Sequence, residues 1–510
     1  MKKILALILL IAMTFSLVAC DLDKIASNFK DAFGDIMEDS DKDSDSSESE
    51  TTSQESTSEE TSEEESSTEE IPVGPNYEDQ TKYYYPEENE QGKYIYRESI
   101  TFSKPVFTQF YHNYKAAVSM TFDDGYHEET GYYVSKAFNK YGFKGTAMFS
   151  VCFVEDEYTQ NEWKKILSYG YIDVGGHGWG HADPTAIADE EELLKETVET
   201  VDFLRKTFTS QNVLTFATPF ARLNEEYKEK LKECVISNRL ESGGNTMELI
   251  GTDLYEVKAI SFNRGRPFSS VQPTIKQMID SGKWVTVLMH CVGGVNSTDV
   301  SEQEFESLCQ YLSFQNDVWV GSFEEVSIYA KQLQNAKLEY TAADKETITF
   351  KLTSTLDKSI YNIPMSAKIY IPSFATTAYA VVDGKVQHSF VKSDMYGKYI
   401  TVLDIPIDSE AVIYLGGNSW CENDCESHNY TLVETVDATC TECAYQLHEC
   451  ENCGNQYRTR FLAPKGHSLD YSKVQEIKAP TEYTTGTSKA PCSTCQKDIE
   501  YLVRYTGDSE

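Results

Sequence analysis

The sequence predicts an α/β domain built from repeated strand–helix units, followed by a β-sandwich and a small cysteine-rich module. Three observations support this organisation. Strands and helices alternate over roughly 225 central residues, β-forming residues dominate 336–416, and eight of the 13 cysteines crowd into 421–495. With 510 residues and 40% apolar content, the chain can bury several cores, which excludes a wholly disordered or collagen-like protein.

The charge of the chain argues against nucleic acid as a partner. The chain has 45 Lys and Arg against 82 Asp and Glu, a net charge of −37 that would repel a phosphate backbone. Much of this acidity lies in residues 38–70, where 15 of 33 residues are acidic and 16 carry hydroxyls. Such a segment has nothing to bury, so we expect a disordered, extended spacer.

The N-terminus has the features of an export signal. Lys2 and Lys3 precede an apolar run over 4–18, too short for a membrane span, and Leu17-Val18-Ala19-Cys20 resembles a bacterial lipobox. We therefore expect a lipoprotein signal peptide over 1–19, lipidation of Cys20, and an acidic Ser/Thr-rich linker over 20–70. An ordinary cleaved signal is the alternative. A tyrosine-rich segment over 71–106 then leads into the central domain.

The central domain, expected over 107–335, alternates strands with helices. The apolar run 117–122 has the composition of a buried parallel strand. Val134, Ala137, Phe138 and Tyr141 then recur at helical spacing before Gly142. Further strands are expected at 146–151, 171–174, 213–217, 284–289 and 318–320. Helical faces are expected around Trp163, Ile166 and Leu167, and around Leu194, Val198, Val201, Leu204 and Phe208. Repeated units of this kind build a barrel or an open doubly wound sheet, with function at the C-terminal strand ends.

Polar clusters fall at three of those strand ends. Asp123 and Asp124 follow the first strand, His177 and His181 follow the strand at 171–174, and His290 follows the strand at 284–289. Two histidines and one carboxylate are a common ligand set for a catalytic divalent ion. One aspartate can bind the ion while its neighbour accepts a proton, and a histidine across the pocket can donate one. These residue types predict metal-assisted hydrolysis of an acyl compound.

These motifs resemble the polysaccharide deacetylase family, also called carbohydrate esterase family 4 or the NodB homology domain. Thr121-Phe122-Asp123-Asp124-Gly125, His177-Gly178-Trp179-Gly180-His181 and Leu288-Met289-His290 match its motifs in order. The resemblance implies a distorted (β/α) barrel, with Asp123 as general base, His290 as general acid, and Asp124, His177 and His181 as metal ligands. It also implies a substrate pocket lined by Trp179, Pro219, Phe220 and Leu288.

The sequence departs from the family pattern at two positions. Gly178 replaces the Ser or Thr that braces the histidine loop, and Ala217 stands where the third motif carries the arginine that holds the base. We hypothesise that Arg222, Arg264 or Arg266 supplies the missing charge from elsewhere.

The resemblance predicts a metal-dependent hydrolase that removes acetyl groups, chiefly N-acetyl, from a cell-wall or surface polysaccharide and releases acetate. One divalent metal is expected, Zn²⁺ first, with Co²⁺ or Ni²⁺ as substitutes. The expected location is the bacterial cell surface, lipid-anchored to the cell membrane on its extracytoplasmic side. Two alternatives remain: an O-acetyl polysaccharide esterase, and a catalytically impaired, carbohydrate-binding surface lipoprotein. No feature of the sequence identifies a protein partner.

The C-terminal third contains two further modules. Residues 336–416 suit an immunoglobulin-like β-sandwich, with Asp383-Gly384 as a hairpin turn. Residues 417–510 carry an internal repeat, because Cys450 and Cys453 recur 42 residues later. Two four-thiol zinc sites or disulfides would each use all eight cysteines of this module, namely Cys421, Cys425, Cys440, Cys443, Cys450, Cys453, Cys492 and Cys495.

Overall fold

The computed structural model describes most of the chain after residue 86. The described residues are 87–88, 93–96, 100–125, 127–241, 249–251, 253–344, 346–417 and 428–505. The expectations for the signal peptide, Cys20, the acidic linker, Cys421 and Cys425 lie outside these residues. No helix within the described residues is both long and apolar enough to cross a membrane.

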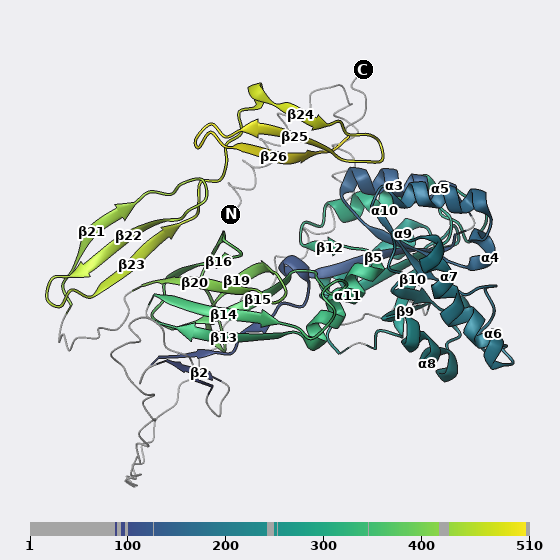
Figure 1. Ribbon diagram of the computed structural model, residues 1–510, viewed down its shortest axis with the longest axis horizontal. Coiled ribbons are helices and arrows are strands. Elements are labelled where there is room, and N and C mark those ends of the chain that lie inside the picture. The colour runs from purple at the N-terminus through teal and green to yellow at the C-terminus, as the bar shows by residue number, and fades with distance from the viewer. Residues whose placement is uncertain are drawn as a thin grey trace, which may run out of the picture. The chain divides into compact units, whose positions relative to one another are not determined.

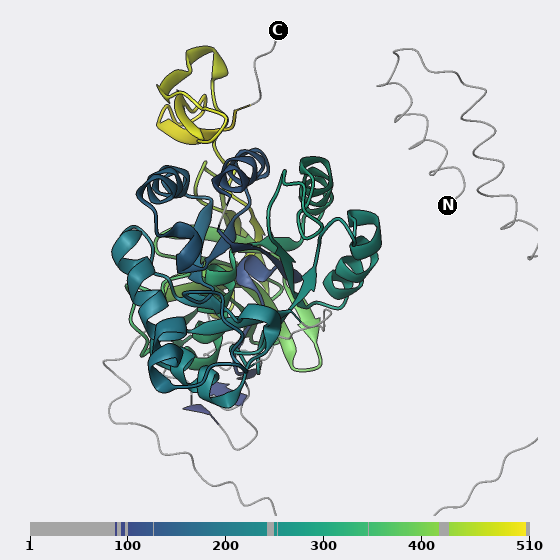
Figure 2. The same ribbon diagram turned by 90° about the vertical axis from the view of Figure 1, so that its right-hand side faces the viewer.

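The central domain is a parallel barrel ringed by helices (Figures 1 and 2). Its strands follow one another in chain order and are β5 Ala116–Asp124, β6 Gly145–Phe149, β7 Ile172–Gly176, β8 Thr215–Ala217, β9 Ser237–Glu241, β10 Val257–Ser261 and β11 Trp284–Met289. The barrel closes because β11 pairs with β5 over six residue pairs, from Trp284↔Ala117 to Met289↔Phe122. The predicted barrel is confirmed.

Strand β5 is the hub of this barrel. It pairs with β11, with β6 from Met120 onward, and with the short β12 Val318–Val320 at its start. Its first eight residues are buried, as expected for an apolar strand covered on both faces. Only Asp124, its last residue, is partly exposed, so the strand delivers its carboxylates to the open end of the barrel.

The helices cover the outside of the barrel. They are α3 Glu128–Tyr141, α4 Val151–Val154, α5 Glu157–Leu167, α6 Glu190–Leu194, α7 Thr200–Thr207, α8 Glu225–Cys234, α9 Phe268–Asp280, α10 Glu302–Ser313 and α11 Phe323–Asn335. Helix α3 ends as predicted, with Gly142 in the left-handed conformation at φ 75° and its N–H bonded to the Phe138 carbonyl. Between α6 and α7 the chain forms a π-helical turn, η3 Lys195–Glu199, where the sequence predicted one regular helical face.

A β-sandwich follows the barrel, as predicted. One sheet has the order β13-β14-β20-β16-β17 and the other β18-β19-β15-β4. The strands are β13 Lys337–Ala343, β14 Thr347–Thr353, β15 Met365–Ile371, β16 Thr377–Val382, β17 Lys385–Ser389, β18 Lys392–Asp394, β19 Gly397–Ile405 and β20 Glu410–Gly416. The β16–β17 turn has Asp383 and Gly384 at φ 49° and 71°, the two positive angles of a type I′ hairpin.

One strand of the sandwich comes from outside the predicted boundaries. β4 Val106–Phe107 precedes the barrel in sequence yet pairs with β15 through Phe107↔Ala367. A three-stranded sheet of β1 Glu87–Glu88, β2 Lys93–Tyr96 and β3 Ile100–Ser103 precedes it. The chain thus contributes a strand to the sandwich before it builds the barrel.

The cysteine-rich module consists of two three-stranded antiparallel sheets. The first contains β21 Tyr430–Val436, β22 Ala444–Cys450 and β23 Gln456–Leu462, and the second β24 Gln475–Lys478, β25 Gly486–Pro491 and β26 Asp498–Val503. Each sheet carries a Cys-x2-Cys turn between its second and third strands. The two sheets are the two copies of the sequence repeat.

Candidate metal and catalytic site

The five predicted chemistry-bearing residues all lie at the C-terminal ends of barrel strands. Asp123 and Asp124 end β5, His177 follows β7, and His290 follows β11. His181 lies in the loop after His177. Parallel strands present their C-terminal ends at one edge, so separate sequence motifs meet there.

Asp124, His177 and His181 offer three ligand atoms within 4.8 Å of one another. The Nε2 atoms of His177 and His181 each lie 3.6 Å from Asp124 Oδ1. Asp124 and His181 both hold left-handed backbone conformations, at φ 75° and 56°. Non-glycine residues rarely adopt this region, and such strain is typical of functional sites.

The ring of His177 is oriented by the strand next to it. Its Nδ1 lies 2.7 Å from the carbonyl oxygen of Ala217, at the end of β8. A carbonyl only accepts, so Nδ1 carries the proton and Nε2 presents its lone pair toward Asp124. Burial lowers the pKa of His177 despite the nearby charges of Asp123 and Asp124. Both effects favour the neutral, metal-binding form.

The loop carrying the two histidines is braced by Glu196, a residue that the sequence did not identify. The Glu196 carboxylate accepts hydrogen bonds from the backbone N–H groups of Trp179, Gly180 and Ala182, at 3.0, 2.8 and 3.3 Å. Glu196 lies in the π-helical turn η3 and is buried. It performs the bracing role expected of a Ser or Thr at position 178.

Gly178 is required by this arrangement. Its φ is 85°, and a Cβ added there would lie 2.6 Å from Glu196 Oε2. A side chain at 178 would therefore displace the bracing carboxylate of Glu196 and would also be strained at this φ.

The charge missing at Ala217 comes from Arg239 on β9. One guanidinium nitrogen of Arg239 lies 2.7 and 2.6 Å from the two carboxylate oxygens of Asp123, and both side chains are buried. Burial alone would raise the pKa of Asp123, but the charges of Arg239, His177 and His290 outweigh it and hold the pKa below its ordinary value. Asp123 is therefore an ionised carboxylate.

Two of the three hypothesised arginines, Arg222 and Arg264, have side chains that are engaged elsewhere. Arg222 pairs with Asp183 at an exposed position, Arg264 donates to the carbonyl of Gly294, and Arg266 bonds through its backbone to Asn263. The hypothesis is corrected in favour of Arg239. The sequence signal was weak, because Ser237-Asn238-Arg239 lacks the apolar pattern of a buried strand.

Asp123 and His290 line one pocket at this edge of the barrel. Phe122, Trp163 and Cys291 also line it. Cys291 lies beside His290, but its thiol is buried and 2.9 Å from Thr130 Oγ1, and burial raises its pKa. A protonated, hydrogen-bonded thiol is a poor nucleophile.

The four predicted pocket residues occupy different environments. Phe220 is exposed and its ring centroid lies 4.7 Å from that of His181. Leu288 and Pro219 are buried. The ring of Trp179 packs against Phe203, with Lys195 above it. Among these four residues, all within the described part of the chain, Phe220 is the one whose ring contacts a candidate metal ligand, His181.

Comparisons with known proteins agree with the motifs. Residues 112–238 match the family model described as polysaccharide deacetylase. A gellan lyase from Bacillus sp. is 24% identical over 315 residues, which are 57% of this chain. The chain spans only 12% of that lyase.

Two solved structures illustrate the structural similarity. A putative polysaccharide deacetylase from Mycobacterium smegmatis has 12% identity and a TM-score of 0.36, with 46% of this chain and 96% of that one covered. Peptidoglycan deacetylase PdaC from Bacillus subtilis has 17% identity and a TM-score of 0.29, with 43% and 95% covered.

The family match includes Asp123, Asp124, His177 and His181 and ends one residue before Arg239. The resemblance seen in the sequence motifs is therefore confirmed by a polysaccharide deacetylase family model that matches residues 112–238.

Proposed function

We propose that the barrel is a metal-dependent hydrolase that removes acetyl groups from an acetylated polysaccharide. The observation that carries the proposal is the convergence of Asp124, His177 and His181 beside a buried Asp123–Arg239 pair, with His290 lining the same pocket. The candidate metal ligands, the candidate base and the candidate acid all lie at the C-terminal edge of the barrel sheet.

The three ligand residues fit a divalent ion. Two imidazoles and one carboxylate leave positions open for water and substrate, as in catalytic sites. The hydrogen bond from His177 to Ala217 fixes the tautomer that a metal requires. Zn²⁺ suits nitrogen and oxygen ligands, and Co²⁺ or Ni²⁺ can replace it. When bound, the ion supplies Lewis-acid activation of water and of the acetyl carbonyl.

The remaining chemistry belongs to the chain's own side chains. Asp123 is ionised, so its carboxylate accepts a proton from the attacking water, and Arg239 keeps that carboxylate in place. His290, when protonated, donates a proton to the leaving nitrogen or oxygen. The products are acetate and a free amine, or a free hydroxyl if the substrate is an ester.

The substrate we favour is a polymer of N-acetylated amino sugars in a cell wall or on a cell surface. An O-acetylated polysaccharide undergoes the same chemistry and is the second candidate. The choice of a surface polymer rests on the proposed location: the segment around Cys20 suits a lipid anchor on the outer face of the cell membrane, and the acidic linker suits a spacer into the wall.

The rival function is a binding protein that has lost turnover. The motivation for it was the glycine at 178 and the missing arginine at 217. Glu196 now braces the loop and Arg239 now holds the base, so both departures have a replacement in the structure. This favours the active enzyme.

Acetate release tests the proposal. The purified protein, stripped of metal and then supplied with Zn²⁺, Co²⁺ or Ni²⁺, is assayed on chitin oligomers, peptidoglycan and acetylated xylan. We expect metal-dependent release that His181→Ala abolishes and that Asp123→Asn reduces strongly while metal still binds. Polysaccharide binding without acetate release from any polymer would establish the rival instead.

A further inference from the structure

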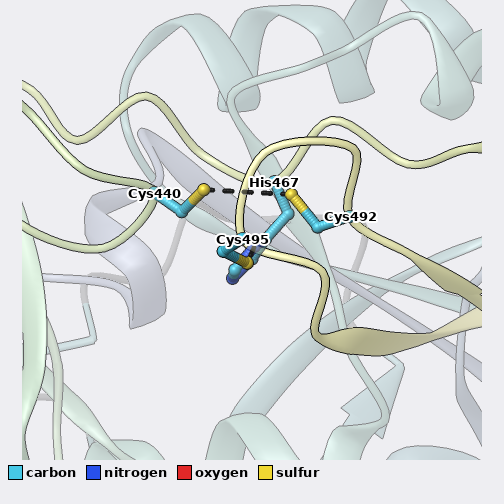
Figure 3. Close-up of side chains that lie close together, drawn as sticks. All are labelled: Cys440, His467, Cys492 and Cys495. Atoms are coloured by element: carbon cyan, nitrogen blue, oxygen red, sulfur yellow. Dashed lines mark hydrogen bonds between the residues drawn. The ribbon is translucent and has the colours of Figure 1, made fainter.

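Four side chains of the cysteine-rich module converge on one point (Figure 3). Cys440, His467, Cys492 and Cys495 each offer a ligand atom, and these atoms lie within 4.8 Å of one another. We propose that these four residues bind a structural zinc ion, independent of the catalytic metal. This replaces the expectation of sites built from thiols alone with a three-cysteine, one-histidine site.

The spacings match tetrahedral zinc. Bonds of about 2.3 Å to sulfur and about 2.0 Å to nitrogen place two sulfurs about 3.8 Å apart, and a sulfur and a nitrogen about 3.5 Å apart. Cys440 Sγ lies 3.8 Å from Cys492 Sγ, and Cys495 Sγ lies 3.4 Å from His467 Nδ1. Six module cysteines lie within the described residues, and none of them forms a disulfide.

The backbone holds these ligands in place. The N–H of Gly466 bonds to the carbonyl of Cys440 at 3.1 Å, which sets His467 next to Cys440. The N–H of Ser493 bonds to the carbonyl of Ser468 at 2.7 Å, which ties the Cys492 turn to the same segment. These two bonds tie together the backbone segments that carry Cys440, His467 and Cys492.

The turn around Cys492 also donates to sulfur. The N–H of Thr494 lies 3.4 Å from Cys492 Sγ. Such N–H groups stabilise a thiolate, which is the form of cysteine that binds metal.

The first copy of the repeat builds the same turn. Cys450 N–H bonds to the Asn455 carbonyl and Gly454 N–H to the Cys450 carbonyl, both at 2.7–2.8 Å. The second copy repeats both bonds 42 residues later, from Cys492 to Lys497 and from Gln496 to Cys492.

The unusual backbone angle of this turn is repeated as well. Gly454 and Gln496 occupy the same place in the two copies and both have positive φ, at 73° and 59°. Glutamine has no intrinsic preference for positive φ. The shared angle therefore reflects the same turn geometry in both copies.

A histidine faces the second thiol of the turn in both copies. His428 Nδ1 lies 3.6 Å from Cys453 Sγ, and His467 Nδ1 lies 3.4 Å from Cys495 Sγ. Two independent copies of one ligand geometry are expected of a built site and not of a chance cluster. His428, Cys450 and Cys453 are the corresponding group of the first copy, with ligand atoms within 4.8 Å of one another.

The module has little else to hold it together. Within 428–505 the buried apolar side chains are Cys440, Cys443, Ala444, Cys450, Phe461, Ala490 and Cys492, so four of seven are cysteines. Strand β24 is exposed throughout. Domains with so small a core need a metal or cross-links for stability, and zinc binding then supplies folding free energy.

Cys443 provides a matched control. It belongs to the same Cys-x2-Cys pair as Cys440 and is equally buried, at 7% exposure, but it is not among the four converging residues. A site made only of thiols would use Cys443, whereas the proposed site uses His467 in its place.

The test is zinc content per chain, measured by elemental mass spectrometry on the purified protein. The His181→Ala background removes a catalytic ligand, so the count reports the module. We expect Cys492→Ser and His467→Ala each to lose about one zinc per chain relative to that background, and Cys443→Ser to lose none. Equal loss in Cys443→Ser and none in His467→Ala would overturn the ligand set.

A second measurement keeps the proposal testable if a variant fails to fold. The unmutated protein is alkylated under native conditions with and without a zinc chelator, and the modified cysteines are identified by peptide mass. We expect Cys440, Cys492 and Cys495 to be protected until the chelator is present. Disulfides linking these cysteines in the zinc-replete protein would overturn the proposal.

Discussion

Arg239 donates from a single guanidinium nitrogen to both oxygens of the Asp123 carboxylate, at 2.7 and 2.6 Å, and only 1% of Arg239 is exposed. The two residues lie on β9 and β5, which are not neighbours in the barrel sheet. Their contact therefore crosses the barrel interior and joins opposite parts of its wall.

Replacing Arg239 tests this contact. We expect Arg239→Met to lower kcat about 100-fold while changing KM little, because the base loses its partner while the substrate-binding surface is kept. Unfolding free energy should fall by about 3–5 kcal/mol, since a buried carboxylate is left unpaired. Steady-state kinetics and denaturant unfolding measure both effects.

The exposed Arg222→Met is the control for that experiment and should behave as the parent protein does. The double variant Asp123→Asn, Arg239→Met carries neither charge, so it should recover part of the lost stability without recovering activity. Unchanged kcat in Arg239→Met would remove Arg239 from its positioning role.

Glu196 provides a second test, through metal affinity. We expect Glu196→Ala to weaken metal binding about 10- to 100-fold, because three N–H groups of the histidine loop lose their acceptor. Competition with a chelating dye measures the dissociation constant. Glu199→Ala, at an exposed position of the same turn, should leave it unchanged. Equal affinity in both variants would contradict the bracing role.

Restoring a side chain at position 178 should do harm here. Gly178→Ser introduces a Cβ that contacts the Glu196 carboxylate, and it places a non-glycine residue at φ 85°. We therefore expect weaker metal binding and lower activity. Gly170→Ala is the matched control: its φ is 81° with nothing within 4 Å of the added Cβ. The control should cost about 1–2 kcal/mol of stability from backbone strain alone, and no metal affinity. A Gly178→Ser protein with normal metal affinity would show that Glu196 and a side chain can coexist.

A pH dependence of stability is expected at the buried Glu324. Burial raises its pKa to about 7, and burial together with the charge of Glu324 raises the pKa of Asp173. The folded state therefore holds protons that the unfolded chain releases above about pH 4.5. The contribution of Glu324 to stability is present at low pH and is lost as the pH rises toward 7.

Melting temperatures at pH 5 and pH 8 check this expectation. Glu324→Gln removes the titrating group, so the fall in melting temperature between the two values should be smaller than in the parent protein. Glu339→Gln, at an exposed position, is the control. An identical fall in the parent and in Glu324→Gln would show that Glu324 does not titrate in this range.

The sequence predicted the parts of the barrel whose strands are apolar. Strands β5, β6, β7 and β11 contain short hydrophobic runs that predict the fold, and the polar motifs after β5, β7 and β11 supply the site candidates. Strands β9 and β10 were missed. Ser237 and Asn238 are fully buried on β9, but they are held by hydrogen bonds to Ser327 and Tyr255, which no local pattern reveals.

The missed strand explains the missed residue. Arg239 contacts Asp123 across 116 positions of sequence, and its burial depends on the closed barrel. Glu196 was missed for a similar reason. Its side chain reaches the histidine loop from a π-helical turn, whereas the sequence there shows ordinary helical spacing. Spacing within a motif is local information, whereas a bracing or positioning contact is a property of the assembled fold.

The β5–β11 pairing also sets when the candidate base and the candidate acid come together. The candidate base Asp123 is the penultimate residue of β5 and the candidate acid His290 follows β11, so the two meet only when strands paired 167 positions apart are joined. A chain that ends at residue 238 contains the three candidate metal ligands but neither Arg239 nor His290. The proposed acetate release should therefore depend on closure of the barrel, because the candidate base and the candidate acid come together only there.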